Sequence, residues 1–352
     1  MVKPGLVVLI GSGETASAAG QVYETIAGNL GQGFTVAVLE TPAGFELNAA
    51  GVARKVADYL ALRLQNYRAN VVCIPARKQD GPFSTNNPEI LSPLLESQLI
   101  FAGPGSPTFT VRQLQDSLAW RYILARHRLG AALVFASAAS IAIGKLALPV
   151  YEIYKVGEDP HWKPGLDLLR VYGLSLVVFP HWNNSDGGAE LDTSRCFMGM
   201  ERFKLLQTQL PEEIAILGID EHTAVIMDLN EGVCHVVGRG AAHVLRQGEE
   251  WTWGEGESFP LEVMGDFKGL VSPEEGIGKE VWEEALARER ERIAAAFSKR
   301  PLPDEVEILV QEREKARKQG QWGEADRIRT QLTRLGWEVR DTPSGPQLIH
   351  RG

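Results

Sequence analysis

The chain has 352 residues, 44% of them hydrophobic, and a formal net charge of −9 at pH 7, values that fit one large globular domain with an appended segment. Residues 301–352 carry as many basic as acidic side chains, so the excess acid lies before them and excludes a long nucleic-acid-binding tract on the body. Three widely separated cysteines without metal-ligand spacing, and the absence of any apolar run long enough to span a bilayer, predict a cytoplasmic protein with no metal and no membrane contact.

The first half of the chain alternates apolar runs of strand length with helical segments. The expected strands are 6–10, 35–39, 71–74, 98–102 and 131–135. Of the helices expected between them, the first ends near residue 30, and the others span 48–66, 88–96 and 111–125. Alternation at this spacing predicts an α/β fold with a doubly wound, mostly parallel sheet. Ligands of such sheets bind at the carboxyl ends of the strands.

Two glycine-rich turns fall at such strand ends. The first, 11–14, resembles half of a dinucleotide fingerprint, but its third glycine is absent, so a tight turn is favoured over a nucleotide site. The second contains Gly103 and Gly105, whose N–H groups could donate to an oxyanion, whereas Pro104 has no N–H. The alternative for the second turn is a simple connection between strand and helix.

Ser137 stands where the apolar run ending at Phe135 changes, without a loop, into small residues that suit a helix. A sharp strand-to-helix turn exposes one side chain above the sheet edge, and the next residue, Ala138, can offer its N–H to an oxyanion. Ser137 is therefore a candidate nucleophile. The alternative is a serine that caps a core helix.

After this helix the pattern of the chain changes. A strand at 174–179 leads to His181, which is well placed for chemistry at a strand end. A strand at 214–219 leads to Asp220 and Glu221. Later segments, in chain order, are expected as antiparallel strands at 225–229, 233–238 and 242–247, linker-like stretches at 254–258 and 272–278, and a charged helix at 280–299.

Three loops, 135–140, 178–182 and 218–224, resemble in order and spacing those of the peptidase S51 family, which includes cyanophycinase and dipeptidase E. The most specific part of this resemblance is the motif Gly218-Ile219-Asp220-Glu221-x-Thr223-Ala224. The resemblance implies a class I glutamine amidotransferase-like fold and a cofactor-free serine hydrolase that acts on a small peptide or amide. It implies Ser137 as nucleophile, His181 as base and Glu221 as the acid that orients it, with Ala138 and either Gly103 or Gly105 in the oxyanion hole.

The chain departs from the family pattern at two places. The family's elbow, Gly-x-Ser-Ala-Gly, has Phe135 and Ala139 at its glycine positions, and the bulk of Phe135 is expected to distort the turn. The loop after His181 also differs, so the substrate is not predicted. The candidate substrate-binding residues are Asn183, Asn184, Arg195 and Arg202. Either arginine could pair with a carboxylate, or could form a surface salt bridge instead.

The segment 310–345 resembles the C-terminal tail of cysteinyl-tRNA synthetase. Its pattern predicts helices at 304–319 and 322–335, followed by a strand pair around the turn 343–345. Four basic residues are candidates for phosphate contact: Arg317, Lys318, Arg327 and Arg329. The expected partner is RNA or a protein, and the zero net charge of the tail favours a small docking module over phosphate binding.

We therefore expect an S51-like α/β domain at 1–250, a linker and charged helix at 251–300, and a helical module at 301–352. The alternative function is a non-catalytic binding protein that keeps the fold, which Phe135 favours, with the module engaging RNA or a partner. The bond that is cleaved and the oligomeric state do not follow from the sequence.

Overall fold

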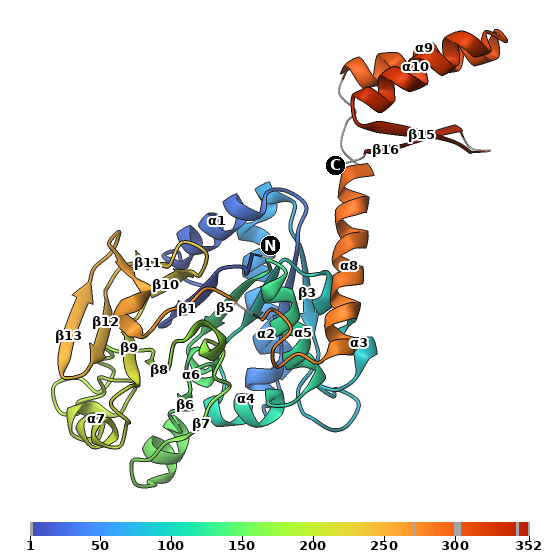
Figure 1. The fold of residues 1–352 in the computed structure, drawn as a ribbon. Helices are drawn as coiled ribbons and strands as arrows, with labels where there is room; N and C mark the ends of the chain where they lie inside the picture. The colour runs from blue at the N-terminus through green and yellow to red at the C-terminus, as the bar shows by residue number, and fades with distance from the viewer. Residues whose placement is uncertain (1–2, 271, 299–303, 343–344, 351–352) are drawn as a thin grey trace. The chain divides into compact units, whose positions relative to one another are not determined.

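The computed structural model describes residues 3–270, 272–298, 304–342 and 345–350. The chain divides into two compact units, Met1–Leu286 and Ala287–Gly352, which are described separately (Figure 1).

The larger unit is built on an eight-stranded sheet of order β14-β11-β10-β1-β5-β4-β2-β3. Its parallel strands are β1 (Val7–Ile10), β2 (Thr35–Leu39), β3 (Asn70–Ile74), β4 (Leu99–Ala102) and β5 (Ala132–Ala136). Antiparallel strands extend it beyond β1: β10 (Thr223–Asp228), β11 (Val233–Gly238) and β14 (Ser258–Pro260). The predicted α/β class with a mostly parallel central sheet is confirmed.

Helices cover both faces of this sheet. They are α1 (Ala19–Leu30), α2 (Ala49–Arg63), α3 (Pro88–Glu96), α4 (Pro107–Leu114), α5 (Leu118–Arg128) and α6 (Ala138–Ala142). Successive side chains of β1 enter two different cores, because Val7 and Leu9 pack with α3 and α5 whereas Val8 and Ile10 pack with α1 and α2. Burial on both faces explains why these strands are continuous apolar runs without polar alternation.

A second sheet, of order β13-β12-β9-β8, was not predicted as a separate layer. Its strands are β8 (Leu176–Phe179), β9 (Ala215–Ile219), β12 (Ala242–Arg246) and β13 (Glu249–Trp253). One face shares the core of the main sheet, and the other packs against α7 (Gly199–Thr208) through Phe203 and Leu206. This packing brings the end of β8 close to the end of β5, although the two strands belong to different sheets.

The predicted linker beginning at residue 251 is wrong for its first part. Trp251 and Trp253 belong to β13, and β14 pairs with β11. A second correction concerns the helix expected at 111–125. It is two helices, because Asp116 has φ 60° and Ser117 begins α5 by accepting a hydrogen bond from the Trp120 N–H (3.1 Å).

Short elements complete the larger unit. They are β6 (Leu146–Ala147), β7 (Lys163–Pro164), the 3₁₀ turns Thr41–Ala43, Gln65–Tyr67, Arg170–Tyr172 and Leu261–Met264, and the π-helical turn Glu152–Val156. Helix α8 (Lys279–Ser298) follows, and its Val281 and Ala285 join the main core.

The smaller unit contains α9 (Asp304–Lys318), α10 (Trp322–Arg334), and the antiparallel pair β15 (Trp337–Thr342) and β16 (Gly345–His350). Its core is formed by Val306, Ile328, Leu332 and Val339. The buried Arg313 donates two hydrogen bonds to the Asp341 carboxylate (3.0 and 2.9 Å). The predicted turn residues 343 and 344 lie outside the described residues.

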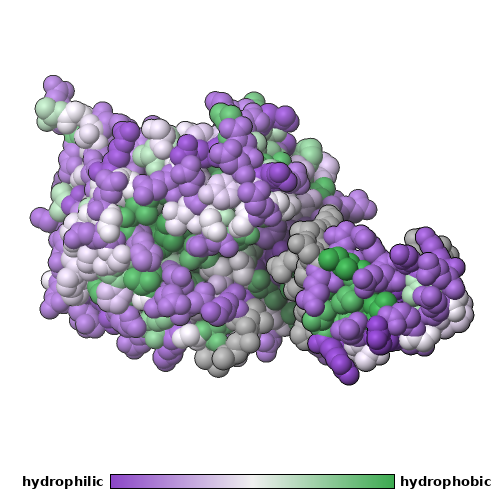
Figure 2. All heavy atoms as spheres, turned by 90° about the horizontal axis from the view of Figure 1, so that it is seen from above, coloured by the Kyte–Doolittle hydropathy of each residue, from purple (hydrophilic) through white to green (hydrophobic). Residues whose placement is uncertain are grey.

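The face of the molecule in Figure 2 is largely hydrophilic, with smaller apolar patches between the polar side chains. Among the described residues, no helix combines the length and apolar character needed to cross a membrane.

Candidate active site

Ser137 lies in a sharp turn between β5 and α6, with φ 51° and ψ −113°. A non-glycine residue in this region is strained, which is typical of functional positions. The turn is fixed from beneath, since the Ser137 N–H donates to the Ile10 carbonyl (3.1 Å) and the Ser140 hydroxyl donates to the Phe135 carbonyl (2.9 Å). The strained turn at Ser137 is thus held by hydrogen bonds to the adjacent strand β1 and to β5, the strand that leads into it.

Phe135 does not occupy the turn. Its side chain is 3% exposed and packs in the main core beside Leu9 and Ala102, its register partners on the adjacent strands. Ala139 is also buried in this core. The sharp turn therefore forms with both residues present, and the bulk of Phe135 is accommodated below the sheet edge.

Ser137, His181 and Glu221 form a continuous hydrogen-bonded chain. The Ser137 Oγ is 3.0 Å from His181 Nε2, and His181 Nδ1 is 2.8 Å from Glu221 Oε1. Because a carboxylate accepts at Nδ1, that nitrogen carries the hydrogen, and Nε2 is left to accept from the serine hydroxyl. The side chains of His181 and Glu221 are 18% and 28% exposed, so this hydrogen-bonded chain is only partly accessible to water.

The Gly11–Gly13 turn packs against the segment that carries Glu221. A Cβ on Gly11 would lie 2.1 Å from the Asp220 carbonyl oxygen, and the Gly11 N–H donates to the Thr223 carbonyl (2.9 Å). The Ser12 hydroxyl accepts from the His222 N–H at 3.3 Å. The small residues of this turn therefore allow a close approach of two backbone segments, as the tight-turn interpretation expects.

Asp220, the acid next to Glu221 in the sequence, has a different partner. Its Oδ2 accepts from the Ala241 N–H (2.9 Å), and its Oδ1 lies 3.4 Å from His243 Nε2. It makes no hydrogen bond to His181 within the described chain. Of the two adjacent acids, only Glu221 is in contact with the His181 imidazole.

Asn183 and Asn184 were expected to contact a substrate, and the structure brings both against Glu221 instead. The Asn184 Nδ2 donates to Glu221 Oε1 (3.1 Å), and the Asn183 Oδ1 accepts from the Glu221 N–H (2.8 Å). Asn184 is 3% exposed, and its Oδ1 also accepts from the Asp186 N–H (3.2 Å). The loop after His181 thus holds both the carboxylate and the backbone of Glu221.

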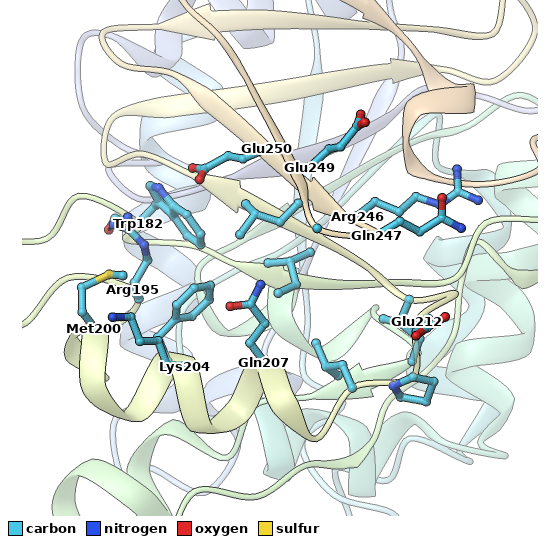
Figure 3. Close-up of a pocket in the computed structure, with 17 residues that line it drawn as sticks. Trp182, Arg195, Met200, Lys204, Gln207, Glu212, Arg246, Gln247, Glu249 and Glu250 are labelled. Atoms are coloured by element: carbon cyan, nitrogen blue, oxygen red, sulfur yellow. Dashed lines mark hydrogen bonds between the residues drawn. The ribbon is translucent and has the colours of Figure 1, made fainter.

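Arg195 lies outside the Ser137 cavity. Its guanidinium stacks 3.9 Å from the centre of the Trp182 ring, and Nη1 donates to the Trp182 carbonyl (3.1 Å). Figure 3 shows both side chains at a second cavity, of about 600 Å³, between α7, β12 and β13. Arg202 is exposed on α7 and lines neither cavity. Neither arginine is therefore placed to contact a ligand above Ser137.

Two residues at the Ser137 cavity have backbone N–H groups without a protein acceptor among the described residues. They are Gly105 and Ala138, which line the same cavity as Ser137. Gly105 has φ 153°, and a Cβ there would lie 1.9 Å from the Pro42 carbonyl oxygen. Gly103 lines a separate small recess beside Glu40 and Phe101, so Gly105 is the better-placed donor of the two glycines.

The cavity above Ser137 has a volume of about 430 Å³, which is in the range of small-molecule sites. Cys196 lies in its wall, and burial raises the pKa of this thiol far above its usual value. It is therefore a thiol rather than a nucleophilic thiolate. Among the residues that the structure describes, no group of three or more His, Cys, Asp or Glu side chains is arranged to hold a metal ion.

The larger unit resembles solved peptidase structures. The chain superposes on a peptidase from an acI-B1 Actinobacterium with a TM-score of 0.58 and 20% sequence identity, covering 74% of this chain and 98% of that one. A putative peptidase E protein from Listeria monocytogenes EGD-e gives a TM-score of 0.43 at 16% identity, over 71% of this chain and 98% of that one. The first similarity establishes the fold of the larger unit.

The end of the chain has different relatives. Residues 299–347 match the family model of the cysteinyl-tRNA ligase anticodon binding domain. The chain is 49% identical over 49 residues to a cysteine–tRNA ligase of Rubrobacter xylanophilus, and 47% identical over 48 residues to cysteine–tRNA ligase 1 of Burkholderia lata. Each match covers 14% of this chain and 10% of the ligase, so the chain spans about a tenth of the length of these relatives.

Sequence reasoning missed the far wall of the Ser137 cavity. Tyr151, Tyr154 and Lys155 come from the π-helical turn and its start, and Phe197 comes from a left-handed turn. No motif marked these residues, because their position depends on a rare helix type and on three consecutive residues with positive φ, Arg195 to Phe197. The sequence signal that remained was the pair Tyr151 and Tyr154, which lies in a stretch to which no strand or helix was assigned.

Proposed function

We propose that the larger unit is a serine hydrolase of the peptidase S51 type that cleaves a peptide or amide bond through an acyl-enzyme. The observation that carries the proposal is the uninterrupted hydrogen-bonded chain from Ser137 Oγ through His181 to Glu221. Serine is a poor nucleophile until a neighbouring base takes its proton, and this arrangement supplies such a base together with the carboxylate that orients it.

In the first half-reaction, Ser137 Oγ bonds to the scissile carbonyl carbon while its proton moves to His181 Nε2. The imidazolium that forms is stabilised by Glu221, which accepts from Nδ1 at 2.8 Å. The carbon–nitrogen bond then breaks, and the proton on Nε2 passes to the leaving amine. In the second half-reaction, water loses a proton to His181 and attacks the ester carbon, and the proton returns to Ser137 as the acid departs.

Negative charge on the carbonyl oxygen would be met by the N–H groups of Gly105 and Ala138. Removal of one such donor lowers the rate of comparable enzymes by about 100- to 1,000-fold. A cysteine-dependent reaction is disfavoured, since Cys196 is buried and held as a thiol. The buried position of Phe135 weakens the alternative of a non-catalytic fold, because the turn that presents Ser137 is formed despite its bulk.

A serine-directed fluorophosphonate probe tests this proposal. The wild-type protein is expected to react, Ser137→Ala to lose the label, and Ser185→Ala, an exposed serine in the loop after His181, to keep it. Unfolding in urea verifies that each variant is folded. A folded wild-type protein that does not react would instead favour the non-catalytic binding protein.

We also propose that residues 301–352 form a separate module that contacts RNA. The supporting observation is the match of 299–347 to an anticodon binding domain. Lys318 and Arg329 are exposed there and form no ion pair within the described residues, and cationic side chains of this kind can bind phosphates. We expect tRNA binding by the full chain that weakens with salt and is lost on deletion of 301–352, with probe labelling kept.

The test variant for this second proposal replaces both Lys318 and Arg329 with glutamine. The control variant replaces Arg63 and Arg68, two cations of the larger unit, with glutamine. Weaker tRNA binding by the first pair alone supports RNA contact. Equal binding by the full chain and the truncated chain would refute it and leave a protein-docking module.

A further inference from the structure

The cavity shown in Figure 3 is separate from the one above Ser137. It has a volume of about 600 Å³ and lies between α7, β12 and β13. No residue that lines it also lines the Ser137 cavity. Its volume is in the range of small-molecule sites, and neither the proposed hydrolysis nor the proposed RNA contact uses it.

The two cavities share a wall made of two chain segments. In one segment His181 lines the Ser137 cavity and Trp182 lines the second cavity. In the other segment Cys196 lines the Ser137 cavity and Arg195 lines the second one. The Arg195 N–H donates to the Trp182 carbonyl (2.9 Å), and the Cys196 N–H donates to the His181 carbonyl (3.1 Å). A ligand in the second cavity would therefore contact the segments that position His181.

Arg195 is fixed at one end of the second cavity. Its guanidinium lies 3.9 Å from the centre of the Trp182 ring and donates through Nη1 to the Trp182 carbonyl. The other two guanidinium nitrogens, Nε and Nη2, form no hydrogen bond within the described chain. Lys204 lies at the same end (Figure 3) and is in no ion pair with another described residue. A planar cation held in this way is suited to a carboxylate.

Glu250 lies near this cationic end without neutralising it. Burial lowers the pKa of the Arg195 guanidinium, and the negative charge of Glu250 acts in the opposite direction. The two side chains thus interact, but they form no ion pair within the part of the chain that the structure describes. A ligand that carries a carboxylate and an ammonium group on one carbon atom could therefore contact both of them.

The remaining lining agrees with a small ligand that has no net charge. Three basic and three acidic side chains line the cavity, so their formal charges cancel: Arg195, Lys204, Arg246, Glu212, Glu249 and Glu250. Apolar side chains supply much of the other surface, with Phe203 from α7, Ile216 from β9 and Leu245 from β12. Such a surface favours a ligand with an aliphatic side chain over a purely polar one.

We propose that the cavity between α7, β12 and β13 is a second binding site, and that its ligand is a free amino acid with an apolar side chain. The carboxylate of the ligand lies at Arg195 and Lys204, its ammonium group at Glu250, and its side chain on the surface formed by Phe203, Ile216 and Leu245. The inference goes beyond the proposed function and does not depend on it, because none of these five residues or of their contacts with the ligand involves Ser137.

The test measures binding of leucine to the full chain by calorimetry, beside three analogues that each lack one feature. Leucinamide lacks the carboxylate, 4-methylpentanoate lacks the ammonium group, and glycine lacks the side chain. Leucine should bind, and each analogue should bind about tenfold more weakly, as expected for loss of one charge-assisted contact or of the buried side chain.

Two exposed residues assign the contacts. Lys204→Gln should weaken the binding of leucine and of 4-methylpentanoate but not that of leucinamide, and Glu250→Gln should remove the advantage of leucine over 4-methylpentanoate. The matched controls are Arg202→Gln and Glu201→Gln, exposed residues of α7 that do not line the cavity, and both should bind leucine as the wild type does. Urea unfolding verifies that each variant is folded.

Arg195→Gln should abolish leucine binding, and Lys155→Gln, which changes a lysine of the Ser137 cavity, should leave it unchanged. Dependence on Lys155 in place of Lys204 and Glu250 would put leucine in the Ser137 cavity and overturn the proposal. Absence of leucine binding, or equal binding of leucine and 4-methylpentanoate, would also overturn it. Reaction of Ser137 with the fluorophosphonate probe is measured separately, so either proposal can fail while the other stands.

Discussion

Replacing Asn184 with alanine should slow the reaction of Ser137 with the probe about tenfold while leaving the protein folded. Asn184 is 3% exposed and donates to Glu221 Oε1, the same oxygen that accepts from His181 Nδ1. A hydrogen bond to a charged group contributes about 1.5–3 kcal/mol, which as a rate effect corresponds to about 10- to 150-fold. We expect the lower end, because the N–H of Glu221 remains bound to Asn183.

The assay is the second-order rate constant for probe labelling, measured beside the urea-unfolding free energy of each variant. Ser185→Ala, in the same loop and exposed, is the matched control and should react at the wild-type rate. A double-mutant cycle identifies the route of the effect. If Asn184 acts only by holding the Glu221 carboxylate, then adding Asn184→Ala to Glu221→Ala should cause little further loss.

Two results would refute this reasoning. Wild-type labelling by Asn184→Ala would show that the carboxylate needs no support from the loop. Full additivity of the two losses would show that Asn184 acts elsewhere, for example on the substrate as the sequence first suggested.

Three further perturbations test other parts of the structure. Gly105→Ala should lower probe labelling at least about 100-fold, because its Cβ would meet the Pro42 carbonyl at 1.9 Å and displace an oxyanion donor; wild-type labelling would exclude this loop from the site. Burial lowers the pKa of His127 to about 3, so the folded protein favours the neutral imidazole. Its contribution to the free energy of unfolding is complete above about pH 6.5. Below that pH the contribution falls by up to about 1.4 kcal/mol per pH unit, because the unfolded chain takes up the proton. Between about pH 6.5 and 4.5 the unfolding free energy of His127→Gln should therefore fall less steeply with pH than that of the wild type. Equal slopes for the two proteins would show that His127 does not cause the pH dependence. Arg313→Ala removes two hydrogen bonds to Asp341 and should destabilise the smaller unit by about 1–3 kcal/mol without changing probe labelling; a parallel loss of labelling would show that the two units depend on each other.

The strands of the main sheet could be predicted from the sequence because their signal is local. A strand covered on both faces is apolar at every position, as β1 and β5 are, and its end is marked by glycine or by a change to small residues. The same logic located Ser137, since a strand that passes directly into a helix leaves one residue at the turn. The resemblance then supplied His181 and Glu221, which lie within hydrogen-bonding distance of each other in the structure.

The remaining features depend on contacts that sequence spacing does not encode. Asn184 and Glu221 are 37 residues apart, and the role of the asparagine follows only from the packing of β8 beside β9. Likewise, β13 was missed because two glutamates before the tryptophans and a threonine between them gave a polar, linker-like composition. On an edge strand such residues can face solvent while Trp251 and Trp253 pack on the core.

The distribution of backbone strain argues that the site is organised before any ligand binds. Ser137, His181, His222 and the turn from Arg195 to Phe197 all have positive φ and surround one cavity or its supporting loops. Hydrogen bonds from neighbouring segments hold these turns, such as that from the Trp182 N–H to the Ile219 carbonyl at 3.0 Å. Because the serine, imidazole and carboxylate already lie 3.0 and 2.8 Å apart, a ligand need not assemble them. In the hydrolase that we propose, the binding energy of the ligand would instead align the scissile carbonyl with Ser137 and the Gly105 N–H. Selectivity would then depend on the cavity wall rather than on the hydrogen-bonded chain, so substitutions at Lys155 or Tyr154 should alter which peptide is preferred, whereas substitutions at Asn184 should lower the rate for all peptides alike.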